Sequence, residues 1–488
     1  MNTMDATTPR PENVQGNIFG GFLKDHQAFV MCHVTDAAKA IAWIRQVACD
    51  QIATSREVLD FNSLFSQSRK RRGREILQSS WLNVAFTRAG LATLGVADAD
   101  IAKMDPSFAQ LDHAAHARSV LGDQSDSDPS NWLGTYQSSD IVHMIAIAAA
   151  DDPEDLDAEV RWLTDSATTS GFEIVGFERG IARRDHPGHE HFGFKDGISQ
   201  PAVDVAAIGD VSAWQFVVNA KAQPPAPSPQ PAQPAYVPGT QPVPTVPSGP
   251  PAWAHEGSYT VFRRLRQRVS AFRKYLNDHC PGGMRPDLFA AKFVGRYRSG
   301  APLEQVDGVA DYDPSKGEPT EVGGRDVLDA SNVNRFMYDK DTSGLSTPLA
   351  AHIRKVNPRD AVAPGHRILR RGIAYGTPFD PDAADPSPAA DGADRGLLFV
   401  CCQASIQNQF EFIQQTWANR PDFPTSGAGV DPIIGAANGS GTRSFAIQMT
   451  DGPFPCNDMS DFVLTTGSLY LFQPSIGALK SAFTTSDP

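Results

Sequence analysis

The 488-residue sequence contains no run of about eighteen apolar residues, the length that a membrane-spanning helix requires. Residues 1–17 lack the apolar core of a secretory signal, and arginine pairs occur only far from the N-terminus. We therefore expect a cytoplasmic location, or export directed by a leader that is not part of this sequence. Positive charge is also scarce, because 43 Lys and Arg residues stand against 56 Asp and Glu residues. This acidic balance argues against a nucleic-acid partner.

Cysteine is rare, and its spacing excludes the common zinc and redox motifs. The six residues stand at positions 32, 49, 280, 401, 402 and 456, with no CxxC pair. Cys401 and Cys402 lie in the apolar run GLLFVCCQASI, so we expect buried thiols. Buried free thiols are compatible with a reducing compartment.

The length allows two or more domains with sizeable cores, and 41% hydrophobic residues indicate a globular protein. Residues 224–251 carry twelve prolines in twenty-eight positions, which excludes a helix or a central strand. We expect a surface insert there, with partner docking as the alternative. The domain boundaries that we predict are a loose arm at 1–16, an N-terminal domain at 17–215, the Pro-rich insert at 222–252, and a C-terminal domain at 253–488.

Hydrophobic patterning in the first half predicts the order strand–helix–strand–strand–helix–strand, which is typical of a ferredoxin-like unit. A similar cycle follows residue 255, so the pattern favours an α+β protein with antiparallel sheets and two units. The expected strands are 28–34, 80–86, 141–149, 172–181, 259–263, 396–404 and 462–472. The expected long helices are 36–51, 153–167, 269–279 and 406–417, with Asp36 and Asp152 as N-caps of the first two.

A dense basic stretch, AAHIRKVNPRDAVAPGHRILRRGIAYG, spans residues 350–376 of this acidic chain. Eight cationic or imidazole side chains lie in it: His352, Arg354, Lys355, Arg359, His366, Arg367, Arg370 and Arg371. An anionic cofactor beside a metal-ligating imidazole would explain the cluster, and haem meets both demands with its iron and its propionates. A solvated basic helix face with one core histidine is the simpler alternative.

Several segments together resemble the dye-decolourising peroxidases, a family of haem peroxidases. They are GFKDGISQP with Asp196, AAHIRKVNPR with His352, ILRRGIAYG with Arg370, the tail segments QASIQNQFEFIQ and PSIGALK, and the opening QGNIFGGFLKDH. The chain length is similar to that of the larger, fungal-type and actinobacterial-type branch of this family. The resemblance implies two ferredoxin-like units with antiparallel sheets and haem b (iron protoporphyrin IX) in the C-terminal half. It also implies reduction of hydrogen peroxide and oxidation of aromatic donors, such as dyes and phenols, through a ferryl intermediate; a homo-oligomer is compatible with it.

The same resemblance assigns site residues. His352 would ligate the iron, and Asp431 in GVDPIIG would accept a hydrogen bond from its other ring nitrogen, with Glu411 as a competing carboxylate. Asp196 would carry the peroxide proton and Arg370 would stabilise the developing negative charge. A carboxylate base remains usable in acid, so we expect an acidic optimum. The simpler interpretation makes Asp196 and Asp431 turn residues.

Three further arginine and histidine assignments follow. Arg354 and His191 would lie near the propionates, with a surface or core role as the alternative for each. Arg371 would point away from Arg370, towards a propionate or solvent. Gly372 stands where compact bacterial members carry asparagine, so no role is carried over to it.

Bulky donors would be oxidised at a surface aromatic residue, and the candidates are Tyr338, Trp417, Trp253 and Tyr375, each of which also fits a core position. Three other functions stay open. A non-catalytic haem-binding or haem-iron-release protein would use the same ligand without needing Asp196 or Arg370. His186, His189 and His191 in HPGHEH could bind zinc or copper. An unrelated α+β binding protein could carry the GxxDG motif by coincidence.

Overall fold

The structure is a computed structural model, and it describes residues 8–72, 77–138, 140–201, 203–204, 211–220, 249–306, 318–322, 325–360, 362–379, 393–436 and 443–483. The Pro-rich insert expected at residues 222–252 lies outside these ranges except for residues 249–252. No helix in the described ranges is both long enough and apolar enough to span a bilayer.

The first half forms the predicted ferredoxin-like unit. Its antiparallel strands pair in the order β2-β3-β1-β4, and they are β1 (His26–Val34), β2 (Ser80–Phe86), β3 (Met144–Ala150) and β4 (Phe172–Ile181). Helices α2 (Ala37–Asp50) and α7 (Pro153–Thr169) begin after Asp36 and Asp152, whose side chains accept from the amides of Lys39 and Glu154. These bonds satisfy amide groups that the first helical turn leaves open, and they confirm the predicted caps.

The second half repeats the arrangement with strands in the order β10-β12-β7-β15. The strands are β7 (Ser258–Gln267), β10 (Leu369–Arg370), β11 (Ile373–Tyr375, also paired with β12), β12 (Gly396–Gln403) and β15 (Val463–Gln473). The unit's helices are α8 (Val269–His279) and η9 (Ile406–Ala418), and η9 has π-helical geometry. Both helices were predicted, whereas β7 is longer than the strand expected from the sequence.

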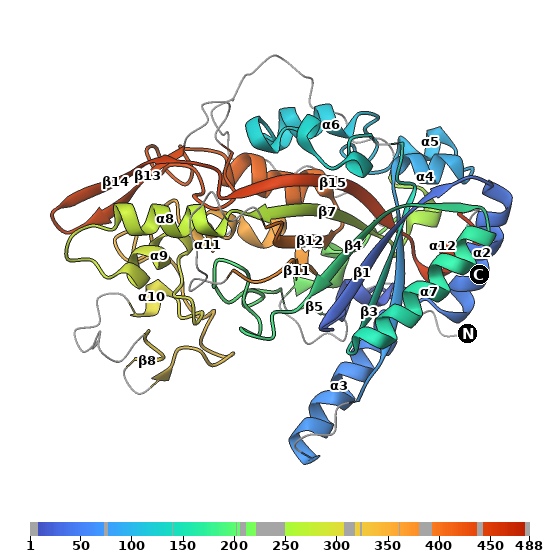
Figure 1. Ribbon diagram of the computed structural model, residues 1–488, viewed down its shortest axis with the longest axis horizontal. Coiled ribbons are helices and arrows are strands. Elements are labelled where there is room, and N and C mark those ends of the chain that lie inside the picture. The colour runs from blue at the N-terminus through green and yellow to red at the C-terminus, as the bar shows by residue number, and fades with distance from the viewer. Residues whose placement is uncertain are drawn as a thin grey trace.

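Smaller elements surround this frame (Figure 1). The helix α3 (Ser55–Arg72) projects from the lower side of the molecule in this view, and the hairpin of β13 (Arg443–Met449) and β14 (Gly452–Met459) extends from its left end. Short helices include α1 (Gly16–Phe19), α6 (His113–His116), η1 (Ala117–Leu121), α9 (Pro286–Val294), α11 (His352–Val356) and α12 (Ile476–Ser481).

The two halves share one nine-stranded sheet that curls until its edges meet. Strand β15 pairs with β2 at Phe472 and Phe86, which joins the halves. At the outer edges, a Cβ added to Gly180 of β4 would lie 2.1 Å from Cγ2 of Ile373 on β11. Glycine at this position therefore allows β4 and β11 to approach closely, and contact between the edges leaves little strand edge open to other chains.

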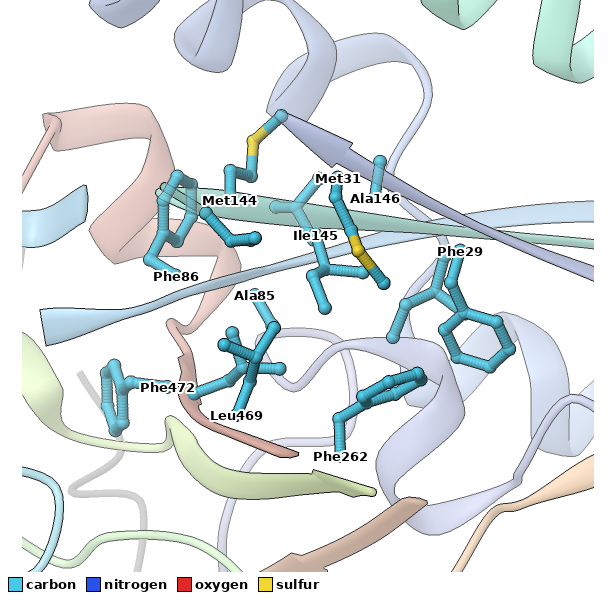
Figure 2. Close-up of a cluster of buried hydrophobic side chains, with 14 of the residues drawn as sticks. Phe29, Met31, Ala85, Phe86, Met144, Ile145, Ala146, Phe262, Leu469 and Phe472 are labelled. Atoms are coloured by element: carbon cyan, nitrogen blue, oxygen red, sulfur yellow. The ribbon is translucent and has the colours of Figure 1, made fainter. Parts of the chain in front are cut away.

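Aromatic and aliphatic side chains from both halves fill the space inside the curled sheet (Figure 2). Phe29 of β1 packs against Phe262 of β7 with ring centroids 5.3 Å apart, and both are at most 1% exposed. Every residue of β3 is buried, because the strand is covered on both faces. The halves are therefore joined by a common hydrophobic core as well as by backbone pairing.

The expected loose arm at residues 1–16 is wrong for the described residues 8–16. Val14 and Gln15 are fully buried, and the Gln15 amide nitrogen donates to the carbonyls of Val84 and Pro474 at 2.9 Å each. Composition suggested a free arm, but a single buried glutamine ties this segment to β2 and to the end of β15.

We predict that Phe262→Ala lowers the free energy of unfolding by about 3–5 kcal/mol, because the lost ring leaves a cavity in the common core. Urea denaturation followed by circular dichroism measures the change. Phe177→Ala, at a ring that is 42% exposed on β4, is the matched control and should change stability by about 0.5 kcal/mol or less. Two separate transitions, of which Phe262→Ala shifts only one, would contradict a core that both halves share.

Candidate active site

A cavity of about 480 Å³ lies in the second half, between the sheet and the helices that cover it. Strands β7, β12 and β15 and helices α11 and η9 line it, together with the loops 121–125 and 190–201 of the first half and several second-half loops, among them 433–436. Its apolar lining includes Leu265, Ile353, Leu397, Phe399, Phe410 and Ile413. The size and the mostly apolar lining are typical of a cofactor site.

His352, the first residue of α11, contributes an imidazole to this cavity. Its Nδ1 lies 2.8 Å from Oδ2 of Asp431, a residue that is completely buried. The other carboxylate oxygen of Asp431 accepts from the amides of Ile433 and Ile434 at 2.8 and 3.0 Å. Asp431 is therefore both the turn residue of the simpler interpretation and the partner of His352. The bond to Nδ1 leaves Nε2 as the nitrogen that can serve as a metal ligand.

Asp196 and Arg370 meet at the same cavity, although 174 positions separate them in the chain. The Arg370 guanidinium donates to Oδ1 of Asp196 at 2.6 Å, and the amide of Gly197 donates to the same oxygen at 2.6 Å. The Asp196 side chain keeps 41% of its surface exposed because it faces the cavity. A carboxylate and a guanidinium are thus available to a small molecule that enters.

The loop that carries Asp196 is held by hydrogen bonds from two neighbouring side chains. The Glu190 carboxylate accepts from the amides of Phe192 and Phe194, each at 2.7 Å. The Gln200 side chain accepts from the Arg370 amide at 3.2 Å and donates to its carbonyl at 3.0 Å. Gln200 therefore pairs with β10 as a neighbouring strand would, and it ties the loop to Arg370. Sequence reasoning did not identify either positioning residue.

Two glycines shape this loop. Gly193 and Gly197 have φ values of +93° and +77°, a region that other residues rarely adopt. Their conformations turn the chain sharply on both sides of Asp196.

The charges of the site shift one another's pKa values. Burial raises the pKa of Asp196, but the Arg370 guanidinium and the Gly197 amide outweigh it and hold that pKa below its ordinary value. Burial lowers the pKa of His352. The contact with Asp431 raises that pKa by more than burial lowers it, so the net shift is upward. The pKa of Asp431 is lowered, because His352 and two backbone amides outweigh its burial. Asp196 and Asp431 are therefore both ionised at neutral pH.

Two arginines that line the cavity, the buried Arg296 and the half-buried Arg359, were not assigned a role from the sequence. Arg296 and Arg359 donate to backbone carbonyls and to Asn334, and no carboxylate pairs with either among the described residues. Nε of Arg359 is buried and has no hydrogen-bond partner there. Burial, with a contribution from Arg359, lowers the pKa of Arg296 to about 10. Uncompensated buried charge of this kind favours an anion in the cavity.

Arg354, His191 and Arg371 lie away from the cavity, in contrast to the roles expected for them. The Arg354 guanidinium donates to the Asp341 carboxylate at 3.0 Å and to nearby carbonyls. His191 Nε2 lies 2.8 Å from the Tyr375 carbonyl, and burial lowers the pKa of His191 to about 4. Arg371 is directed away from Arg370 as predicted, but it donates to carbonyls at the end of α1, not to a propionate or solvent.

The competing interpretations of other side chains find no support. Glu411 contacts Ser107, His116 and Tyr470, not His352. Within the described ranges, no group of three or more His, Cys, Asp or Glu side chains is arranged to hold a metal ion. The histidines of HPGHEH therefore do not form the zinc or copper site considered above.

The four aromatic relay candidates are core residues. Tyr338, Trp417, Trp253 and Tyr375 are 3–7% exposed, so a bulky donor cannot contact any of them directly. The cysteines are all free, and Cys401 and Cys402 are buried as predicted. Cys32 and Cys456 are also buried, Cys280 is half-buried, and Cys49 is exposed.

Comparison with known proteins agrees with the fold. Residues 13–183 match the family model of the DyP dimeric alpha+beta barrel domain, and residues 290–425 match that of the Dyp-type peroxidase C-terminal domain. The chain is 31% identical to dye-decolorizing peroxidase msp1 of Mycetinis scorodonius, over 96% of this chain and 86% of that protein. It is 34% identical to the multifunctional dye peroxidase DyP2 of an Amycolatopsis species, over 82% of each chain.

A solved structure agrees over a similar extent. The crystal structure of a fungal DyP-type peroxidase from Auricularia auricula-judae superposes with a TM-score of 0.76 at 28% identity, and covers 98% of this chain and 100% of that one. The fold, the paired residues of the cavity and these similarities together show that the chain belongs to the family of DyP-type, or dye-decolorizing, peroxidases.

Proposed function

We propose that this peroxidase binds haem b in the cavity, with His352 as the iron ligand and with Asp196 and Arg370 as the groups that act on hydrogen peroxide. The observation that carries the proposal is the convergence of two pairs, His352 with Asp431 and Asp196 with Arg370, on one apolar cavity. No hydrogen bond links one pair to the other in the described part of the chain, and this leaves the space between them for a cofactor and a substrate.

The lining of the cavity fits haem in two respects. Its apolar side chains suit the porphyrin faces, and an imidazole with one free nitrogen suits the iron. Arg296 and Arg359 supply positive charge in the lining, which two propionates would compensate. Haem binding would therefore remove an electrostatic cost that the protein alone carries.

When bound, haem supplies an iron centre that accepts oxidising equivalents from peroxide and passes them on one electron at a time. Asp196, ionised because of Arg370, takes the proton from one peroxide oxygen and returns it to the other, which leaves as water. The Arg370 guanidinium stabilises the negative charge that develops as the O–O bond breaks. Asp431 holds His352 in one tautomer and increases its basicity as a ligand.

We infer that the electron donors are aromatic compounds, because dye peroxidases are among the relatives of the chain. Hydrogen peroxide is small enough to reach Asp196 inside the cavity, whereas large dyes require another point of electron transfer. The non-catalytic alternative gives no role to an ionised Asp196 paired with Arg370, so the geometry supports the peroxidase.

Asp196→Asn is expected to slow the reaction with hydrogen peroxide by about 100-fold to 10,000-fold, because the amide cannot carry the proton. Stopped-flow absorbance of the haem-loaded protein measures the rate, and the resting spectrum should stay unchanged. Asp185→Asn, which alters an exposed carboxylate paired with Arg183 ahead of the loop, is the control and should react at the wild-type rate. A normal rate in Asp196→Asn would remove this residue from the mechanism.

The pH dependence of the same reaction reports on Arg370. Without the guanidinium, burial raises the pKa of Asp196, so the acid limb of the rate profile should move about 1–3 pH units upward in Arg370→Leu. Arg370→Lys keeps the charge and should leave the limb close to its wild-type position. Identical acid limbs in the wild type and in Arg370→Leu would show that Asp196 is not the titrating base.

Asp431→Asn should weaken haem retention about 10–100-fold, because the hydrogen bond that orients His352 loses its charge. Haem transfer to an excess of a scavenger apoprotein measures retention. Asp422→Asn, which alters an exposed carboxylate paired with Arg420, serves as the control and should retain haem as the wild type does. Equal haem retention in all three proteins would show that Asp431 does not support His352 as the iron ligand.

A further inference from the structure

Tyr470 of β15 lies one aromatic ring away from the cavity and has a carboxylate within hydrogen-bond distance. Its side chain is buried, with 6% of its surface exposed, and its hydroxyl donates to Oε1 of Glu411 at 2.8 Å. Phe410, the residue before Glu411 on η9, lines the cavity, and its ring centroid is 6.4 Å from that of Tyr470. The helix η9 thus places the Phe410 ring at the cavity and the Glu411 carboxylate against the buried phenol of Tyr470.

The Glu411 carboxylate has three hydrogen-bond partners, and none of them takes part in the proposed reaction with peroxide. Ser107 Oγ donates to its Oε2 at 2.6 Å, and His116 Nε2 lies 2.5 Å from Oε1, the oxygen that Tyr470 contacts. The His116 side chain is 14% exposed, so the network reaches solvent at this end. Three hydrogen-bonding groups thus surround one buried carboxylate.

We propose that Tyr470 is a redox-active residue, which gives an electron to the oxidised cofactor while its phenolic proton moves to Glu411. This inference rests on the proposed haem peroxidase function. It gives the enzyme a buried site outside the cavity at which an oxidising equivalent can be held.

The proton acceptor makes the oxidation feasible in a buried place. Burial first, and then Glu411, raise the pKa of Tyr470, so the side chain is a neutral phenol at any pH that the protein tolerates. A phenol that loses an electron becomes strongly acidic, and an unpaired positive charge in the interior is costly. Transfer of the proton over 2.8 Å to Glu411 leaves a neutral radical next to a neutral acid.

Neighbouring groups also favour Tyr470 over the other tyrosines that contact carboxylates. Tyr375 donates to Asp394, but the Arg264 guanidinium carbon lies 4.2 Å from its ring centroid and opposes removal of an electron. Tyr136 donates to Glu178 at 3.2 Å, and Glu178 is itself paired with Arg264. The nearest ring to Tyr470 is that of His113, at 4.4 Å between centroids, and burial lowers the pKa of His113 to about 3, so it carries no charge. The His116 ring lies farther away, at 6.1 Å, and Arg263, which also acts on Tyr470, is paired with Asp123.

The electrons and the proton of the Tyr470 oxidation are all accounted for by the reaction with hydrogen peroxide and by Glu411. Reduction of one hydrogen peroxide to water takes two electrons from the enzyme, and Tyr470 returns one of them while its O–H bond breaks. The electron goes to the oxidised cofactor and the proton goes to Oε1 of Glu411. An aromatic donor then reduces the radical by one electron, and the proton returns from Glu411 to the phenolate oxygen.

Freeze-quench electron paramagnetic resonance on the haem-loaded enzyme tests the proposal after one equivalent of hydrogen peroxide. The wild type should give a tyrosyl signal that narrows when the protein contains ring-deuterated tyrosine. Tyr470→Phe should lose most of this signal, because only the hydroxyl is removed from a buried ring. Glu411→Gln should lose it as well, although Tyr470 is still present, because an amide does not accept the proton.

Tyr259→Phe is the matched control, since Tyr259 is a buried residue of the adjacent strand whose hydroxyl accepts from the Asp105 amide. This variant should keep the signal. A peroxide-induced change of the haem absorbance is recorded in every sample. If that change is absent in the wild type, the proposed function itself fails. If the change occurs but no tyrosyl signal forms, or if the signal survives in Tyr470→Phe, the role of Tyr470 is overturned and the peroxidase assignment stands.

Discussion

The ion pair between Asp196 and Arg370 requires the two halves of the chain to be placed accurately against each other. Asp196 follows the last strand of the first unit, and Arg370 lies on a two-residue strand of the second. Their contact is possible because β2 and β15 join the units into one sheet and because Phe29 and Phe262 share one core. The Gln200 side chain then fixes the loop to the backbone of Arg370 itself. Reactive geometry at the cavity is therefore a consequence of how the halves pack.

Charge distribution around the cavity explains why a protein with net charge −13 concentrates arginines in one stretch. Arg370 has a carboxylate partner, Arg371 is used to bind the end of α1, and Arg354 pairs with Asp341. Arg359 keeps a buried Nε that has no hydrogen-bond partner in the described residues, and no carboxylate there pairs with it. One basic segment thus serves three structural purposes and leaves charge for an anionic cofactor. The cofactor would then contribute to stability as well as to chemistry, because it binds only the folded protein.

Two carboxylates of the proposed mechanism handle different protons. Asp196 is open to the cavity and is paired with a guanidinium, which suits a group that must exchange a proton with a small substrate. Glu411 is closed off from the cavity and holds three hydrogen-bond donors, which suits a group that keeps a proton close to its source. The π-helical turn of η9 supplies both Phe410 and Glu411, and distorted helices of this kind are frequent at functional sites.

The sequence alone determined the elements and the main reactive residues. The periodicity of residues 36–51 and 153–167, with an aspartate ahead of each, predicted α2 and α7 because capping and amphipathicity are local properties. The motifs around Asp196, His352 and Arg370 indicated residues that the fold then brings to one cavity. Only the tertiary structure decided which cations remain for a cofactor, because Arg354, Arg359 and Arg371 are alike in the sequence and differ in what they contact. It likewise decided that residues 8–16 are packed, that Trp417 and Tyr375 are buried, and that Glu411 serves Tyr470 and not His352. These outcomes depend on contacts between residues far apart in the chain, and no local pattern of side chains encodes such contacts.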